Sequence, residues 1–292
     1  MLSTLLVVLA LATDTSAVLR IPVAASESLT VNTVGAGAAL VVIPGIAGSA
    51  FAFRRMVPLL VAAGYRVVVV EPLGMGTSGR PERSDYTLEA QAARIASVLD
   101  TLGIRHALVV GHSLGASIAL RMALARPELV RSVVLIEGGA AEQAATPGFR
   151  RAMTFAPWVK MLGGQGLIRK QLRKSLAKSS ADPAWITDEV IAGYSLGVTR
   201  GLDPTLRAYL RMAEAREKNP LAPRLGRVHV PVLLVLGGAP HESGPDSREV
   251  ELLFKGLPSF TLRLIPAAGH HVHEERPCEL ASLIESFDLP RP

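Results

Sequence analysis

Short runs of consecutive apolar residues recur along the chain and constrain its fold more than any other feature. They are LVVIPG at Leu40, RVVVVEP at Arg66, ALVVGHS at Ala107, VRSVVLIEGG at Val130, VPVLLVLGG at Val230 and FTLRLIP at Phe260. Strands without polar alternation are buried on both faces, as in a parallel sheet covered by helices. Two alternating segments before the first run, VLRIPV and SLTVNTV, predict a hairpin that leads into it.

Helical patterns lie between these runs, at residues 51–63, 87–102, 114–126, 247–256 and 277–287. Because strand and helix alternate, we expect an α/β fold with a mostly parallel, eight-stranded sheet flanked by helices. The interval 141–227 breaks the alternation, since it holds helical stretches and no convincing strand. We therefore predict an inserted helical cap at 141–227, with 18–140 and 228–292 forming the core.

The predicted cap carries a large share of the bulky side chains of the chain. They are Phe149, Met153, Phe155, Trp158, Met161, Trp185, Tyr194 and Tyr209. We expect some of them to pack the cap onto the core and a minority to line a pocket.

Composition excludes several function classes. Aromatic residues make up only 4% of the 292 residues, and there is no repeat or low-complexity tract, which argues against base-stacking nucleic-acid modules and solenoids. The net charge of +6 comes from basic residues spread along the chain. The densest basic cluster is Arg169, Lys170, Arg173, Lys174 and Lys178, whose helical spacing is typical of a solvated face. We predict no nucleic-acid partner, and the oligomeric state stays open.

The N-terminal stretch MLSTLLVVLALATDTSA has the pattern of a signal peptide, with an apolar core from Leu5 to Ala12 and small residues up to Ala17. Residues 1–17 are therefore a predicted signal peptide. This favours export over the alternative, a cytoplasmic protein with an apolar N-terminus. The run is too short to span a bilayer, and no later segment reaches the roughly 18 apolar residues of a span, so we expect no stable membrane insertion. Cys278, the single cysteine, excludes an internal disulfide.

The sequence VVGHSLGAS places Ser113 between a predicted strand and a predicted helix, in the pattern G-x-S-x-G. A nucleophile on such a turn has strained backbone geometry, and a side chain at either flanking glycine, Gly111 or Gly115, would clash with a neighbouring element. The turn holds the hydroxyl above the sheet. It also directs the amide of Leu114 and the helix N-terminus toward a developing oxyanion.

With this motif the chain closely resembles the α/β-hydrolase family, from Val18 to the C-terminus. The loop IPGIAGSAFAF at Ile43 is similar to the oxyanion loop of that family, which implies that the Ile46 amide is the second oxyanion donor. Many family members have a histidine before the glycine, whereas Pro44 stands there in this chain. The segment EPLGMGTSGRP resembles the family's turn after the fourth strand, which is usually introduced by aspartate instead of Glu71.

The same turn contains Gly74, Gly76 and Gly79 in the pattern G-x-G-x-x-G, which also occurs in dinucleotide-binding sites. In those sites the third glycine lies within the helix that the turn opens. Here Arg80 and Pro81 follow, and no helix is expected before Thr87. We therefore interpret the glycines as a surface turn and predict no cofactor.

The segment LIPAAGHHVHEERP follows the last predicted strand, and His270 fits the family's G-H-x-x-x-E pattern with Gly269 and Glu274. The resemblance implies that His270 is the general base that takes the Ser113 proton. A metal site built from His270, His271, His273 and Glu274 lacks the spacing of two ligands on one helix, and we predict none. The remaining histidines, His106, His112, His229 and His241, are interpreted as structural.

The third catalytic group, a carboxylate that orients the histidine, is harder to find. In most of the family it lies about three residues past the glycine that ends the strand after the cap, and counting from Gly237 reaches Pro240. Two acids in the same loop, Glu242 and Asp246, are displaced from that position. Glu137 ends an earlier strand, at the same carboxyl edge as Ser113, and some family members are similar in placing their acid there. We predict Glu137, with Glu242 and then Asp246 as alternatives.

These features predict a serine hydrolase that acts through an acyl-enzyme. The resemblance implies a carboxylic ester as the substrate, with an apolar acyl or aryl part that suits the predicted cap. Carbon-carbon bond hydrolases, lactonases, amidases and acyltransferases use the same residue set and stay open. A ligand-binding member of the fold without turnover is the alternative from another class.

Overall fold

A computed structural model describes residues 16–143 and 164–288 of the chain. Most of the predicted signal peptide and the bulky residues from Phe149 to Met161 lie outside the described residues. Within them no helix combines the length and the apolar composition that crossing a bilayer requires.

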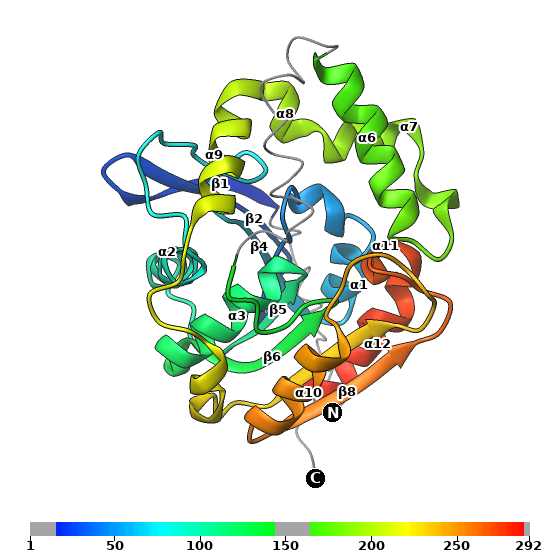
Figure 1. Ribbon diagram of the computed structural model, residues 1–292. Helices are drawn as coiled ribbons and strands as arrows, with labels where there is room; N and C mark the ends of the chain where they lie inside the picture. Colours follow the sequence, from blue (N-terminus) through cyan, green and yellow to red (C-terminus); the bar gives the residue numbers. More distant parts are fainter. Residues whose placement is uncertain (1–15, 144–163, 289–292) are drawn as a thin grey trace, which may run out of the picture.

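One eight-stranded sheet forms the centre of the molecule, in the order β1-β2-β4-β3-β5-β6-β7-β8. The strands are β1 (Ala17–Ala24), β2 (Glu27–Val34), β3 (Ala38–Ile43), β4 (Tyr65–Glu71), β5 (Ala107–His112), β6 (Val130–Ile136), β7 (Val232–Gly237) and β8 (Phe260–Ile265). The first two strands form the predicted hairpin, and β2 joins β4 in antiparallel pairing. All other pairs are parallel. The predicted fold class is confirmed (Figure 1).

Helices cover both faces of the sheet. They are α1 (Val57–Ala62), α2 (Leu88–Thr101), α3 (Leu114–Ala125), α10 (Ser247–Gly256), α11 (Val272–Glu275) and α12 (Pro277–Asp288). Side chains alternate along β3: Val41 belongs to the core cluster under α2 and α3, whereas Val42 belongs to the cluster under α1 and α12. This alternation explains why the strand sequences are apolar at every position.

Among the described residues between β6 and β7, four helices lie together at the top of the view in Figure 1. They are α6 (Gly164–Lys178), α7 (Asp188–Tyr194), α8 (Leu196–Arg200) and α9 (Leu202–Glu214). The basic residues of α6 are mostly solvent-exposed, as their spacing predicts, and Lys178 pairs with Glu242. We call α6 to α9 the inserted helices.

Gly74 and Gly76 are buried and Gly79 is half-buried, so the prediction of a surface turn is wrong for the first two glycines. A methyl group added at Gly74 would lie 2.5 Å from Met212 and 3.1 Å from Ala208, both on α9. A tight turn needs glycine here for two reasons: its φ is +87°, and the helix above leaves no room for a side chain. The first helix after the turn is α2, which begins at Leu88, so the dinucleotide geometry is absent from this described segment.

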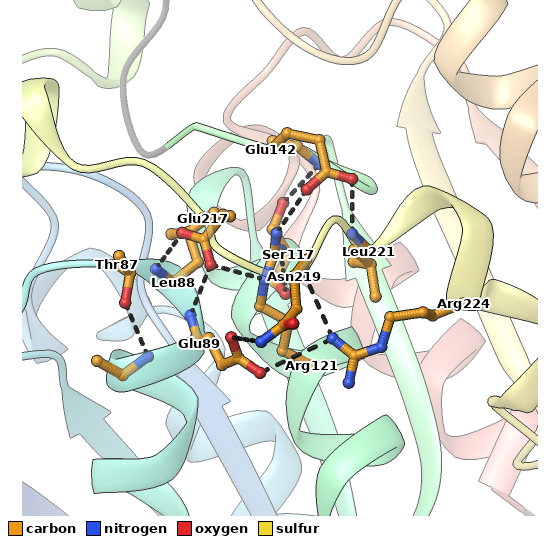
Figure 2. A network of polar contacts seen from close by, with 12 residues as sticks. Thr87, Leu88, Glu89, Ser117, Arg121, Glu142, Glu217, Asn219, Leu221 and Arg224 are labelled. Atoms are coloured by element: carbon orange, nitrogen blue, oxygen red, sulfur yellow. Dashed lines mark hydrogen bonds and ion pairs between the residues drawn. The ribbon is translucent and has the colours of Figure 1, made fainter.

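A buried polar network ties the two ends of the insertion to the core (Figure 2). Arg121 on α3 lies 3.1 Å from the Glu142 carboxylate, before the inserted helices, and 3.5 Å from the Glu217 carboxylate, after them. Glu217 also accepts hydrogen bonds from the Leu88 and Glu89 amides at the N-terminus of α2. One guanidinium thus joins both ends of the insertion to two core helices, one of which follows Ser113 directly.

Replacing Arg121 with methionine is expected to destabilise the protein by about 3 kcal/mol, because it leaves the buried Glu217 carboxylate without its cation. The free energy of unfolding in urea measures this loss. Arg126→Met removes an arginine that pairs with Asp100 at the surface and serves as the matched control, with a much smaller loss expected. Equal losses in the two variants would show that the network does not hold the insertion.

Candidate active site

Ser113 lies in the strand-to-helix turn that the sequence predicts. β5 ends at His112 and α3 begins at Leu114, and Ser113 between them has φ +52° and ψ −117°. This is a strained conformation for a residue with a side chain. A methyl group at Gly111 would lie 2.3 Å from the Gly115 carbonyl oxygen, and one at Gly115 would lie 2.1 Å from the Ile43 carbonyl oxygen. Both glycines of the motif are therefore required by close backbone approach.

The predicted oxyanion loop lies directly against Ser113. A methyl group added at Gly45 would be 3.0 Å from the Ser113 Cβ atom. Ile46 follows Gly45 in a tight turn, which the hydrogen bond from the Gly48 amide to the Gly45 carbonyl closes at 2.9 Å. Leu114, the other predicted donor, is the first residue of α3, where amides have no partner within the helix.

Glu71 supports the predicted oxyanion loop through hydrogen bonds to its carboxylate. Its buried carboxylate accepts hydrogen bonds from the Ala50 amide at 2.9 Å and the Thr77 amide at 2.6 Å. The two oxygens thus bridge the oxyanion loop and the glycine-rich turn. The family resemblance leaves the role of this carboxylate open, and the geometry makes it a structural bridge.

His270 is held by backbone contacts on both sides. Its amide donates to the Ser179 carbonyl at the end of α6 at 2.8 Å, and its carbonyl accepts from His112 Nε2 at 3.0 Å. The first contact comes from the inserted helices and the second from the residue before Ser113. The end of β5, the loop that carries His270 and the segment after α6 therefore meet at His270.

Glu137 lies where β6 ends and faces the histidine. Its carboxylate is 2% exposed, and Oε2 is 3.5 Å from His270 Nδ1. The backbone of β6 also holds Ser113, whose amide donates to the Ile136 carbonyl at 2.8 Å. Glu137 itself has φ +50°, a second strained residue at this sheet edge. The structure thus places Glu137 against His270, at the end of the strand whose last residue binds the Ser113 amide.

The loop GGAPHESGPD after β7 packs around the Glu137 carboxylate. The Gly237 amide donates to Oε1 at 2.5 Å, and His241 Nε2 lies 3.1 Å from Oε2. Gly244, with φ +98°, packs so closely that an added methyl group would lie 2.4 Å from Oε2. The contact of His241 was missed by the sequence analysis, which interpreted this residue as structural.

The two alternative acids each have a partner other than His270. Glu242 is exposed and pairs with Lys178 at 2.8 Å. Asp246 caps the N-terminus of α10, where its side chain accepts from the Glu249 amide at 2.9 Å.

The neighbouring histidines form a buried cluster with neutral rings. Burial, together with nearby His270, lowers the pKa of His112 to about 3. Burial also lowers the pKa of His271 and His273 well below the ordinary histidine value, and the histidines around them add to this effect. Phe53 stacks on the ring of His273 at 4.7 Å. The cluster packs beside the candidate site.

Glu274 belongs to a separate ion pair. Its carboxylate lies 2.5 Å from Arg54 Nη1 and accepts from the Tyr194 hydroxyl at 2.9 Å. Burial raises its pKa, and the Arg54 guanidinium opposes that rise. The four-residue metal set considered from the sequence is therefore divided: Glu274 holds the insertion, while His270 faces Glu137.

Two of the bulky residues of the insertion lie beside the candidate site. Trp185 and Tyr194 contact the ring of His271, with centroids 5.4 Å and 6.4 Å away. Phe51, in the segment after the oxyanion loop, meets Tyr194 edge to face. Tyr209, in contrast, packs in the main core cluster.

Comparison with known proteins identifies the family. The family profile described as alpha/beta hydrolase fold matches residues 38–184, half of the chain. This chain is a member of the α/β hydrolase fold family. The matched residues include the turn at Ser113, the loop that contains Ile46, and Glu137. Among curated relatives, a putative carbamate hydrolase, RutD, of Stutzerimonas stutzeri is 31% identical over 79% of this chain and 84% of its own length.

A second relative, the 2-hydroxy-6-oxononadienedioate/2-hydroxy-6-oxononatrienedioate hydrolase of Paraburkholderia xenovorans, is 28% identical over 88% of this chain and 89% of its own. The crystal structure of Cfl2 from Burkholderia cenocepacia superimposes with a TM-score of 0.75 at 26% identity, covering 92% of this chain and 95% of Cfl2. These matches cover from 79% to 92% of this chain and from 84% to 95% of the other proteins. The protein is a hydrolase of the α/β fold.

Proposed function

We propose that this protein is a serine hydrolase of carboxylic esters, with Ser113, His270 and Glu137 as its catalytic residues. The observation that carries the proposal is the 3.5 Å approach of Glu137 Oε2 to His270 Nδ1, at the same sheet edge as Ser113. A carboxylate in this position holds the histidine proton on Nδ1 and leaves Nε2 free to accept the proton of the serine.

The reaction proceeds in two steps. The Ser113 hydroxyl attacks the ester carbonyl while His270 takes its proton, and the amides of Ile46 and Leu114 stabilise the oxyanion. His270 then protonates the departing alcohol. Water hydrolyses the acyl-enzyme with His270 again as the base. Glu137 stabilises the imidazolium in both steps, and the scheme requires no cofactor.

The substrate class is inferred from the surroundings of the site. Trp185, Tyr194 and Phe51 form an aromatic group beside the histidine loop, and this favours an apolar acyl or aryl part of moderate size. We assign residues 141–227 as a cap that contributes Trp185 and Tyr194 to this aromatic group. Residues 18–140 and 228–292 form the catalytic core. Carbon-carbon hydrolysis is the second candidate, because a relative of matching length is named for the hydrolysis of a dienedioate.

A substrate screen tests the assignment. Purified protein is offered p-nitrophenyl esters of increasing acyl length, an aryl carbamate and a 2-hydroxy-6-oxodienoate, with Ser113→Ala as the control. We expect ester turnover that peaks at an intermediate acyl length. Cleavage of the dienoate without ester turnover would replace the ester assignment by the carbon-carbon one. Binding of esters without any turnover would favour a non-catalytic ligand-binding member of the fold.

A further inference from the structure

Two imidazoles face one carboxylate oxygen in the candidate site. Glu137 Oε2 lies 3.1 Å from His241 Nε2 and 3.5 Å from His270 Nδ1. One ligand atom from each of the three residues lies within 4.8 Å of the other two. The serine mechanism uses only one of these histidines. It does not explain why His241 also faces the Glu137 carboxylate.

The hydrogen bond of His241 fixes which of its ring nitrogens carries the proton. Nδ1 lies 2.8 Å from the Ala239 carbonyl oxygen, which can only accept, so Nδ1 is the donor. In the neutral ring Nε2 then holds a lone pair, and this lone pair points at a carboxylate oxygen. Two acceptors at 3.1 Å repel, so this contact requires a positive charge between the two atoms, either a second proton on the His241 ring or a metal ion. A ligating histidine in metalloproteins has this same arrangement, with its other N–H bonded to a carbonyl.

The separations fit a small transition-metal ion. Bonds of about 2.0–2.1 Å in a tetrahedral zinc site place neighbouring ligand atoms about 3.3 Å apart. The two measured distances from Oε2, 3.1 Å and 3.5 Å, bracket that value. Two imidazoles and one carboxylate suit Zn²⁺, Co²⁺ or Ni²⁺, whereas Mg²⁺ and Ca²⁺ prefer sets of oxygen ligands.

We propose that Glu137, His241 and His270 form a binding site for a divalent transition-metal ion such as Zn²⁺, and that the bound ion inhibits the hydrolase. A metal on His270 Nδ1 displaces the proton to Nε2. Nε2 is then unable to accept the proton of Ser113, and Glu137 is occupied as well. The inhibition rests on the proposed function, whereas the metal binding does not.

Metal binding is therefore measured first, on Ser113→Ala protein treated with a chelator and titrated with Co²⁺, whose visible absorption reports a tetrahedral nitrogen and oxygen site. We expect one Co²⁺ per chain, displaced by Zn²⁺ and unaffected by Mg²⁺. His241→Gln and, independently, Glu137→Gln in the same background are expected to weaken binding at least tenfold, as loss of a ligand should. His229→Gln removes an exposed histidine outside the site and is the matched control.

The inhibition is measured separately on protein with Ser113 intact. Zn²⁺ is expected to slow fluorophosphonate labelling of the wild type at least tenfold, and His241→Gln should shift this response to at least tenfold higher Zn²⁺ concentration. Absence of Co²⁺ binding, or binding that both ligand variants retain, overturns the metal site. Binding that both variants retain would place the ion elsewhere, for example among His112, His271 and His273. Failure of metal-free labelling would instead contradict the proposed function.

Discussion

Replacing Glu137 with glutamine is expected to lower kcat for ester hydrolysis by about 10³- to 10⁴-fold, as loss of the acid does in other serine hydrolases. The Gly237 amide donates to Oε1, so the amide oxygen of the new side chain should stay there and its NH₂ group should take the place of Oε2. That NH₂ group would donate to His270 Nδ1 and force the imidazole proton onto Nε2. Steady-state kinetics on the best ester of the screen measures the effect.

The two neighbouring acids provide matched controls for this variant. Glu242→Gln breaks an exposed ion pair with Lys178, and Asp246→Asn keeps an oxygen that caps α10. Both are expected to retain kcat within about twofold, since surface changes of this kind cost little. Full turnover in Glu137→Gln combined with loss in Glu242→Gln would reverse the assignment of the acid.

Replacing Ser113 with alanine is expected to have the largest effect, a loss of about 10⁶-fold in kcat, because the acyl-enzyme route then disappears. The fold should survive, since alanine is smaller than serine and both flanking glycines remain. Circular dichroism and the free energy of unfolding check this. Turnover that stays within tenfold of the wild type would mean that another group attacks the substrate.

The core of the fold was predictable from local patterns. Apolar runs of strand length can be buried on both faces only in a covered parallel sheet, and β3 to β8 follow them closely. The nucleophile turn was predictable because two glycines around Ser113 meet a backbone requirement that the structure shows at Gly111 and Gly115. The prediction of Glu137 as the acid came from elimination and from a shared sheet edge, and the structure places its carboxylate 3.5 Å from His270 Nδ1.

Features that depend on packing between distant segments could not be predicted. Nothing near His241 in the sequence indicates that its ring turns toward Glu137, because that orientation comes from the Ala239 carbonyl and the path of the loop. The glycine-rich turn was placed at the surface because its sequence does not reveal the α9 side chains above it. The buried contact of Arg121 with Glu217 likewise joins residues far apart in the chain.

Covalent labelling of the nucleophile tests the central claim most directly. Metal-free wild-type protein is treated with a fluorophosphonate, and the modified peptide is identified by mass spectrometry. We predict one adduct per chain, on Ser113, absent from Ser113→Ala and formed far more slowly in Glu137→Gln. An adduct on another residue, or labelling that persists in Ser113→Ala, would contradict the assignment of Ser113 as the nucleophile.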